Sequence, residues 1–395
     1  MRFDDLVEIN PKVKLTKGKS YPFIKMENVT PGRRYPQIVK RNFIGGGAKF
    51  QSGDTLFARI TPCLENGKIT QFISNEEAVG FGSTEFFVFR NKEGISDPSF
   101  IYYLASSDLI RKPAEKSMSG ASGRQRADLA SIRNAEVPII DLVLQQKIAS
   151  ILSAYDDLIE NNTRRIKILE EMAQSLYREW FINFRFPGHE KVKMVNSPFG
   201  KIPKGWTVVK FTDIADVLSG GTPSTKESAY WDGNIPFFTP KDASTNFYVT
   251  ETEKNITELG LSKCSSQLYP RNTVFITARG TVGKVIMPAT DMAMNQSCYA
   301  LVGNDGISQP FLFFLTRQTS DLLRKHTGGA TFSTIIVDTF KKIDILKPAD
   351  EIIHPFTEQV TSILDKVLNS LYQNINLQYT RDLLLTELIS DFRED

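Results

Sequence analysis

Basic side chains gather in loops rich in glycine, serine and threonine, and such loops occur in both halves of the chain. Small residues let a loop approach a phosphate backbone, and arginine beside it can read base edges in a groove. These residues therefore predict contact with a nucleic acid. In the first half the candidates are Arg33, Arg34, Lys40, Arg41, Arg59, Lys68, Arg124 and Arg126. In the second half they are Lys226, Lys241, Arg279, Lys284, Thr331 and Ser333.

An alternative interpretation applies to the residues that recur in both halves. Arg59 and Lys68 follow one strand-like segment as Arg279 and Lys284 follow another. Such repeated positions are equally typical of structural ion-pair partners beneath a turn. For any single basic residue, a solvated or structural role is commoner than contact with a base.

Residues for catalysis are scarce. The three histidines, His189, His326 and His354, form no HxxxH or HExxH pair, which argues against a histidine metal site or a Ser-His-Asp triad. The stretch 280–284 is too short for a nucleotide-binding P-loop. The chain also has no Pro-Pro pair, so the Asn/Asp-Pro-Pro-Tyr/Phe motif of amino-methyltransferases is missing.

A metal-dependent nuclease cluster can be drawn from Asp54, Glu65 and Lys68, because carboxylates and a lysine bind metal and activate water. The second half has Asn272 and Val282 at the matching carboxylate positions. A duplicated catalytic site is therefore disfavoured.

Composition places the chain among globular proteins. It has 395 residues, 41% of them hydrophobic and 24% charged, which excludes wholesale disorder and suggests two to four domains. We find no signal-like or membrane-spanning apolar run. Three cysteines without CxxC spacing argue against disulfides and a zinc cluster, so a cytoplasmic location is expected.

Charge is distributed unevenly. Residues 1–140 hold 21 basic and 15 acidic side chains, whereas residues 351–395 hold 3 basic and 8 acidic ones. This pattern fits a polyanion that touches some segments and not others.

The second half repeats the first. Residues 148–152 recur as 360–364, and further matches follow in the same order in both halves. Short β-branched or aromatic runs predict strands, so the fold class is mixed α+β. The predicted domains are a globular domain (1–140), a central helical spacer (141–184), a loop connector (185–205), a second globular domain (206–350) and a C-terminal helical spacer (351–395).

The two spacers have a near-heptad apolar stripe that an isolated helix could not expose to water. Pairing with each other as an antiparallel coiled coil would bury it and relate the two globular domains by a pseudo-twofold axis. Asn162 and Asn374 fall at matching a-type positions, where a buried amide can set helix register. The alternative is that both asparagines are exposed at helix kinks.

A set of motifs stands in a specific order and is duplicated along the chain. These motifs are 145–149, 158–172, 197–206, 272–275, 279–284 and 329–331. Through them the sequence resembles, over almost the whole chain, the DNA-specificity subunit of type I restriction-modification systems.

The resemblance implies two target-recognition domains, each reading one half of a bipartite site in double-stranded DNA. It implies that the helices act as a ruler and as a docking surface for two modification (methyltransferase) subunits and for restriction (translocase/nuclease) subunits. It further implies no catalysis by this chain and no cofactor bound to it, with S-adenosylmethionine, ATP and Mg²⁺ belonging to the partner subunits.

Two other classes of function remain open from sequence. One is a coiled-coil adaptor whose domains bind proteins, and the other is a fused nuclease or methyltransferase. Strongly salt-dependent binding to duplex DNA distinguishes the specificity subunit from the adaptor.

Overall fold

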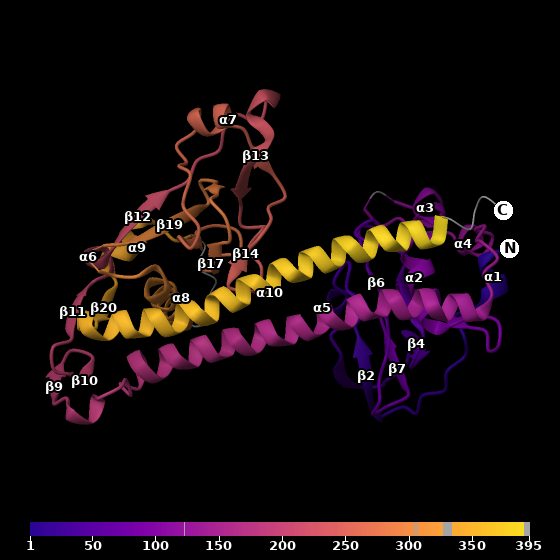
Figure 1. Ribbon diagram of the computed structural model, residues 1–395, viewed down its shortest axis with the longest axis horizontal. Coiled ribbons are helices and arrows are strands. Elements are labelled where there is room, and N and C mark those ends of the chain that lie inside the picture. Colours follow the sequence, from indigo (N-terminus) through magenta and orange to yellow (C-terminus); the bar gives the residue numbers. More distant parts are fainter. Residues whose placement is uncertain (122, 305, 327–333, 391–395) are drawn as a thin grey trace. The chain divides into compact units, whose positions relative to one another are not determined.

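The computed structural model describes residues 1–390 except 122, 305 and 327–333 (Figure 1). The chain forms two compact units: unit 1 is 1–162 with 373–395, and unit 2 is 163–372. Both boundaries fall inside long helices, α5 (Leu142–Tyr177) and α10 (Asp350–Ser390), so each unit contains part of each helix. Within the described ranges, no helix is long and apolar enough to cross a membrane.

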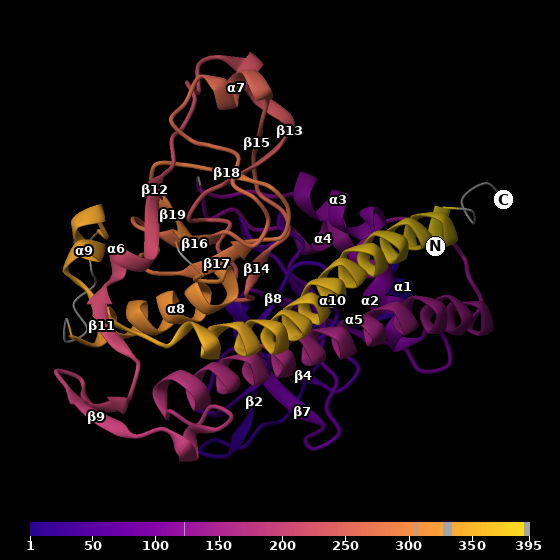
Figure 2. The same ribbon diagram turned by 60° about the vertical axis from the view of Figure 1, so that its left-hand side comes forward.

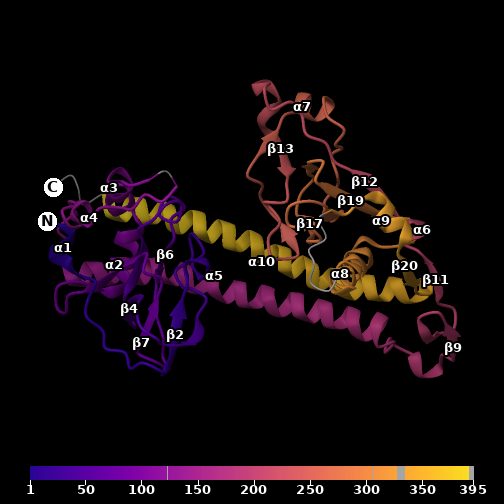
Figure 3. The same cartoon turned by 180° about the vertical axis from the view of Figure 1, so that it is seen from behind.

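Unit 1 contains two four-stranded sheets, with strand orders β1-β8-β5-β6 and β3-β2-β7-β4. Figures 1 and 3 show α2 beside the unit 1 part of α5. The strands are β1 (Val7–Ile9), β2 (Ser20–Ile24), β3 (Val39–Asn42), β4 (Ala48–Gln51), β5 (Thr55–Ala58), β6 (Ile69–Gln71), β7 (Val79–Gly82) and β8 (Phe86–Asn91). The shorter helices are α1 (Phe3–Leu6), η1 (Met26–Asn28), α2 (Pro98–Ser106), α3 (Asp108–Lys116) and α4 (Leu129–Arg133).

Unit 2 contains a five-stranded sheet of order β12-β19-β16-β17-β14 and a three-stranded sheet of order β15-β13-β18. Figure 2 shows β13, β15 and α7 grouped at the end of this unit away from α8. The strands are β11 (Thr207–Lys210), β12 (Ala215–Ser219), β13 (Trp231–Phe238), β14 (Tyr248–Val249), β15 (Asn255–Ile256), β16 (Val274–Thr277), β17 (Val285–Pro288), β18 (Ala293–Met294), β19 (Cys298–Gly303) and β20 (Asp344–Lys347). The shorter helices are η2 (Arg178–Ile182), α6 (Phe211–Ile214), η4 (Ser228–Tyr230), α7 (Glu258–Ser262), α8 (Gln309–His326) and α9 (Val337–Lys342).

The sheet topologies confirm the internal repeat. The order β1-β8-β5-β6 recurs as β12-β19-β16-β17, antiparallel in both. The parallel pairing of β2 with β7 likewise recurs between β13 and β18. The two units are thus copies of one mixed α+β fold.

The connector differs from its prediction. Residues 185–205 contain η3 (His189–Lys191) and an antiparallel hairpin of β9 (Met194–Ser197) and β10 (Gly200–Pro203), where a loop without strands was expected. Gly200 follows the two-residue turn with φ +91°, a conformation that glycine adopts without strain. The turn chemistry therefore overrides the loop-like composition of this segment.

The long helices complete the core of each unit. In unit 1, Ile148 and Leu152 of α5 are buried in one cluster with Phe57 and Phe89 of the sheet and Leu385 of α10. Along this unit the helices run antiparallel, because the start of α5 meets the end of α10. The helical stripes thus pack on a domain as well as on each other.

Unit 2 uses aromatic packing for the same purpose. Phe356 of α10 lies 4.8 Å from Phe181 and 6.1 Å from Tyr177, measured between ring centroids. Burial raises the pKa of Glu170 on α5 to about 7, although the amide of Phe247 donates to its carboxyl at 2.6 Å.

Both register asparagines are buried in unit 1. Asn162 is 7% exposed and Asn374 6%, and the Asn162 amide donates to Gln373 at 3.4 Å across the helix pair. Exposure at a kink is therefore excluded, while the role in register stays a prediction. The pseudo-twofold relation of the two domains also stays a prediction.

Replacing Asn162 and Asn374 together by leucine should raise the free energy of unfolding by about 1–2 kcal/mol, because two buried amides become apolar. Urea unfolding of the chain measures this. The same variant should co-purify less well with the modification subunit if the amides set register. The control is Asn161→Leu at an exposed neighbouring position. Its free energy of unfolding should rise by only a few tenths of a kcal/mol, because leucine has a higher helix propensity than asparagine. Unchanged assembly of the double variant would contradict the register role.

Candidate nucleic-acid interface

A basic groove of about 610 Å³ lies on unit 1. The loop after β1 forms one wall, and the starts of β4 and β8 form the others. Its cationic lining residues are Lys12, Lys14, Lys49 and Arg59. A concave surface with cations and exposed backbone suits a phosphate chain.

Two local features hold the groove in shape. Asn10 adopts φ +53° and fixes the loop to β8 through two hydrogen bonds. Its backbone N–H donates to the Val88 carbonyl at 2.8 Å, and its side-chain oxygen accepts from the Val88 N–H at 3.0 Å. Gly47 has φ +75°, and a Cβ there would lie 2.4 Å from the Gly82 carbonyl oxygen. The shape of the wall formed by the loop after β1 therefore depends on Asn10, and that of the wall at the start of β4 depends on Gly47.

Sequence reasoning missed most of this groove. The loop between β1 and β2 contains four lysines within eight residues, Lys12, Lys14, Lys17 and Lys19, and all four are exposed. The density of lysine in this short loop was the available signal. The segment is poor in the small residues that mark the other candidate loops, so that criterion does not select it.

Arg59 is an ion-pair partner as well as a groove residue. Its Nε lies 3.1 Å from Glu85, and Arg126 also reaches this carboxylate, with Nη2 2.7 Å away. The hydrogen bond from Arg126, together with the charge of Arg59, lowers the pKa of Glu85. The three side chains together retain one positive charge.

The match between Arg59 and Arg279 is corrected by the backbone. The Arg59 carbonyl accepts from Ala127 at 2.8 Å, and in unit 2 the Ala278 carbonyl accepts from Ile335 at 2.9 Å. Ala278 is therefore the counterpart of Arg59, and Arg279 lies one residue further along. Arg279 is exposed, so it is still available to a ligand.

Lys68 and Lys284 are true counterparts with the same structural role. The Lys68 ammonium donates to the Met26 carbonyl at 2.9 Å, and the Lys284 ammonium donates to the Ala243 carbonyl at 2.8 Å. Each lysine thus ties its turn to the loop after the equivalent strand, β2 or β13. Each ammonium has two further N–H donors, so the expectation that they reach a phosphate stays a prediction.

Arg33 and Arg34 face inward. Arg34 is 5% exposed, and its guanidinium donates to Gln71 at 2.7 Å and to Ser153 at 2.6 Å. Arg33 donates to the Ile159 carbonyl of α5 at 3.3 Å, and burial lowers its pKa. The prediction of DNA contact is therefore wrong for Arg34, because its donors are used inside the fold, and Arg33 is turned toward the helix.

The other predicted cations are exposed. Lys40 pairs with Glu76 at 3.5 Å and Lys241 with Glu253 at 3.7 Å, both weak surface pairs. The exposed candidates are Lys40, Arg41, Arg124, Arg126, Lys226, Lys241 and Arg279. Thr331 and Ser333 lie outside the described residues.

The nuclease cluster does not form. Asp54 is 1% exposed, and both of its carboxylate oxygens accept from Arg90, at 2.8 and 2.7 Å. Within the described ranges, no group of three or more His, Cys, Asp or Glu side chains could hold a metal ion.

Comparison with known proteins assigns the family. The family model described as type I restriction modification DNA specificity domain matches residues 1–171 and 203–380. The chain belongs to this family. It is 26% identical to the specificity subunit of the type I restriction enzyme HindI from Haemophilus influenzae over 401 residues, which cover 86% of each chain.

Two further similarities agree with this family. The MjaIX specificity subunit of Methanocaldococcus jannaschii is 34% identical over 176 residues, 44% of this chain and 40% of that protein. The crystal structure of the type I restriction-modification S subunit from M. genitalium has a TM-score of 0.56 and 14% identity, covering 98% of this chain and 95% of that one. The latter supports the type I specificity-subunit fold.

Lys68→Met and Lys284→Met should each lower the free energy of unfolding by about 1–2 kcal/mol, because a half-buried carbonyl loses its charged donor. Urea unfolding measures the loss. Lys241→Met, which changes an exposed lysine, is the control and should leave stability within about 0.5 kcal/mol. A Lys284→Met variant with unchanged stability and weakened DNA binding would contradict the structural role and support the phosphate role.

Proposed function

We propose that this chain is the DNA sequence-recognition subunit of a type I restriction-modification complex, in which each unit reads one half of a bipartite target. The duplicated fold carries this proposal, since two copies of one domain in one chain suit two separate half-sites. Family membership supports it. The chain itself performs no catalysis and acts in the cytoplasm, where its DNA is.

In unit 1 the proposed phosphate contacts are the groove lysines Lys12, Lys14 and Lys49, with Arg59 at the edge. Exposed Lys40, Arg41 and Arg124 extend the positive surface. In unit 2 the proposed phosphate contacts are the exposed residues Lys226, Lys241 and Arg279. Lysine contacts mainly fix position on the backbone, while arginine is able to pair with guanine in the major groove.

The partner subunits dock on the long helices in this proposal. In unit 1, Val143, Ile151 and Leu158 of α5 are 63%, 46% and 51% exposed. Spacings of eight and seven residues place them on one helix face. An exposed apolar stripe of this kind marks a protein interface. Two modification subunits and the restriction subunits are the proposed partners, and they supply S-adenosylmethionine, ATP and Mg²⁺.

Co-expression with the modification subunit of the same host system, followed by base-resolution mapping of methyladenine, tests the proposal. The expected result is a motif of two short fixed blocks with a constant gap, absent when this chain is omitted. A stable complex without methylation would favour a protein-binding adaptor instead.

Replacing Lys12 and Lys14 by glutamine should weaken binding of the complex to its mapped target and reduce the slope of log K against log salt by about 2, one unit for each lost phosphate contact. Fluorescence anisotropy between 50 and 300 mM salt measures this. Lys342→Gln with Lys366→Gln, at exposed positions outside the groove, is the charge-matched control. Equal slopes for both variants would remove the groove from the interface.

A further inference from the structure

One loop of unit 1 contacts the long helices through four successive residues. We call residues Gly32–Tyr35 the clasp loop. Arg33 donates to the Ile159 carbonyl at 3.3 Å, and the Tyr35 hydroxyl lies 2.9 Å from the Asp157 carboxylate, both on α5. The Gly32 carbonyl accepts from Arg381 of α10 at 2.9 Å. Both helices are thus held by the same short segment.

Arg34 extends the clasp loop into the domain. Its guanidinium donates to Gln71 on β6 at 2.7 Å, to Ser99 on α2 at 2.6 Å and to Ser153 on α5 at 2.6 Å. A planar guanidinium with five fixed donors allows little change in the angle between these elements. Sheet, α2 and α5 are therefore linked through one buried side chain.

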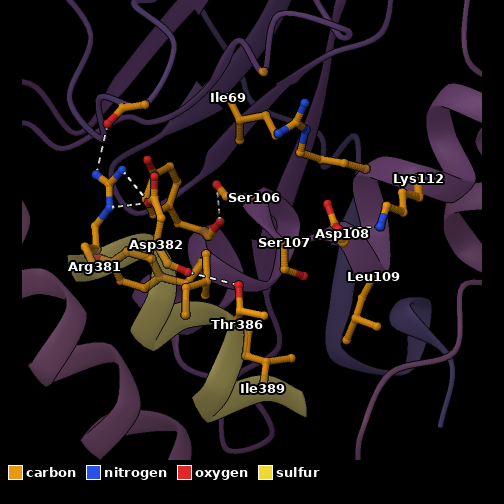
Figure 4. Close-up of a pocket in the computed structure, with 16 residues that line it drawn as sticks. Ile69, Ser106, Ser107, Asp108, Leu109, Lys112, Arg381, Asp382, Thr386 and Ile389 are labelled. Carbon is orange, nitrogen blue, oxygen red and sulfur yellow. Dashed lines mark hydrogen bonds and ion pairs between the residues drawn. The ribbon is translucent and has the colours of Figure 1, made fainter. Parts of the chain in front are cut away.

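Asp156 of α5 links the other helix to the same point. It accepts from the Tyr103 hydroxyl at 2.5 Å and forms an ion pair with Arg381 of α10, and Tyr103 in turn lies 3.3 Å from Arg34. We call Arg34, Tyr103, Asp156 and Arg381 the buried network. Arg381 lies at the edge of a pocket of about 490 Å³, where Figure 4 shows its bond to Asp382.

The charges of the buried network are deeply enclosed. Arg34, Asp156 and Arg381 are 5%, 3% and 5% exposed. Burial is the largest single influence on Arg381 and lowers its pKa. The groups around it, Asp156 first and then Tyr102 and Asp382, together outweigh burial, so the pKa is raised. Such groups contribute little net stability compared with apolar side chains of the same volume, yet they tolerate few alternative geometries.

Unit 2 is attached to the helices differently. The equivalent loop after β13 is fixed through the Phe247 amide, which donates to Glu170 of α5 at 2.6 Å. Phe314 of α8 packs on Phe247 at 5.5 Å between ring centroids. The same Phe314 ring lies 5.6 Å from Tyr177 of α5 and 6.2 Å from Phe356 of α10. Apolar contacts are non-directional, so they constrain an angle less than a guanidinium fork does.

We propose that the clasp loop and the buried network fix the angle and position of the first recognition domain on the helix pair, so that the gap between the DNA half-sites is read to one base pair. This inference rests on the proposed function. One base pair moves a half-site by about 3.4 Å and turns it by about 35°. Only a rigid joint between domain and helices discriminates such a step.

The test replaces the buried charges with apolar groups of similar volume, Arg34→Met, Asp156→Leu and Arg381→Met together, in the complex with the modification subunit. The DNA probes are the mapped target and versions with the gap one base pair shorter or longer. The wild type should methylate the altered gaps at least about 100-fold more slowly. The variant should read the same bases but lose most of this discrimination, to within about tenfold.

A second, milder variant tests the joint if the triple variant does not fold. Tyr103→Phe with Ser153→Ala removes only two hydroxyls of the joint. It should also lower the discrimination against altered gaps, by a smaller factor than the triple variant does. The control, Lys210→Met with Asp344→Leu, removes an exposed ion pair that joins β11 to β20 of unit 2 and involves no residue of the long helices. Its side chains are 47% and 49% exposed, and the variant should keep full discrimination.

The outcomes separate the two proposals. Unchanged gap discrimination in a folded triple variant, or in the hydroxyl variant if the triple variant does not fold, contradicts the joint alone. A wild-type complex that methylates no bipartite motif contradicts the proposed function, and this inference with it. Relaxed gaps with unchanged base preference support the joint, since a loss of folding would lower methylation of all probes equally.

Discussion

The apolar stripe of the two long helices is the constraint on which the rest of the structure depends. A helix with such a stripe is not stable alone in water, because its apolar face must be buried. In unit 1 the stripe is buried against the sheet and α2 as well as against the partner helix, and in unit 2 it lies within the aromatic core. Each domain therefore needs both helices to close its core. A domain that is completed by the helices cannot move freely on them.

Much of this architecture follows from sequence. The repeat at a spacing of just over 200 residues predicts two copies of one fold, and the matching sheet orders confirm it. The heptad-like stripe predicts the long helices, and each of them starts within one residue of its predicted bound, at Leu142 and at Asp350. These features depend on local periodicity, which a single sequence displays directly.

The candidate site was harder to predict, for physical reasons. Arg34 and Lys12 are both basic residues in loops, but the partners of Arg34 lie 37 to 119 residues away in sequence. Nothing local distinguishes a guanidinium that is enclosed by such partners from one in solvent. The match of Arg59 with Arg279 was wrong by one residue, because motif spacing does not reveal which residue ends a strand. Lys68 and Lys284 were paired correctly, but their carbonyl acceptors are visible only in the fold.

Unit 1 uses positive charge in two separate ways, and salt acts on them differently. The groove lysines are exposed, so their attraction to phosphate falls as ionic strength rises, within a Debye length of about 10 Å at 0.1 M. The charges of the buried network are enclosed at 5% exposure or less and are screened far less. Affinity can therefore change with ionic conditions while the setting of the domain on the helices does not. A protein that must find a short bipartite site among many others benefits from this separation, because weaker non-specific contact then leaves the geometry of recognition intact.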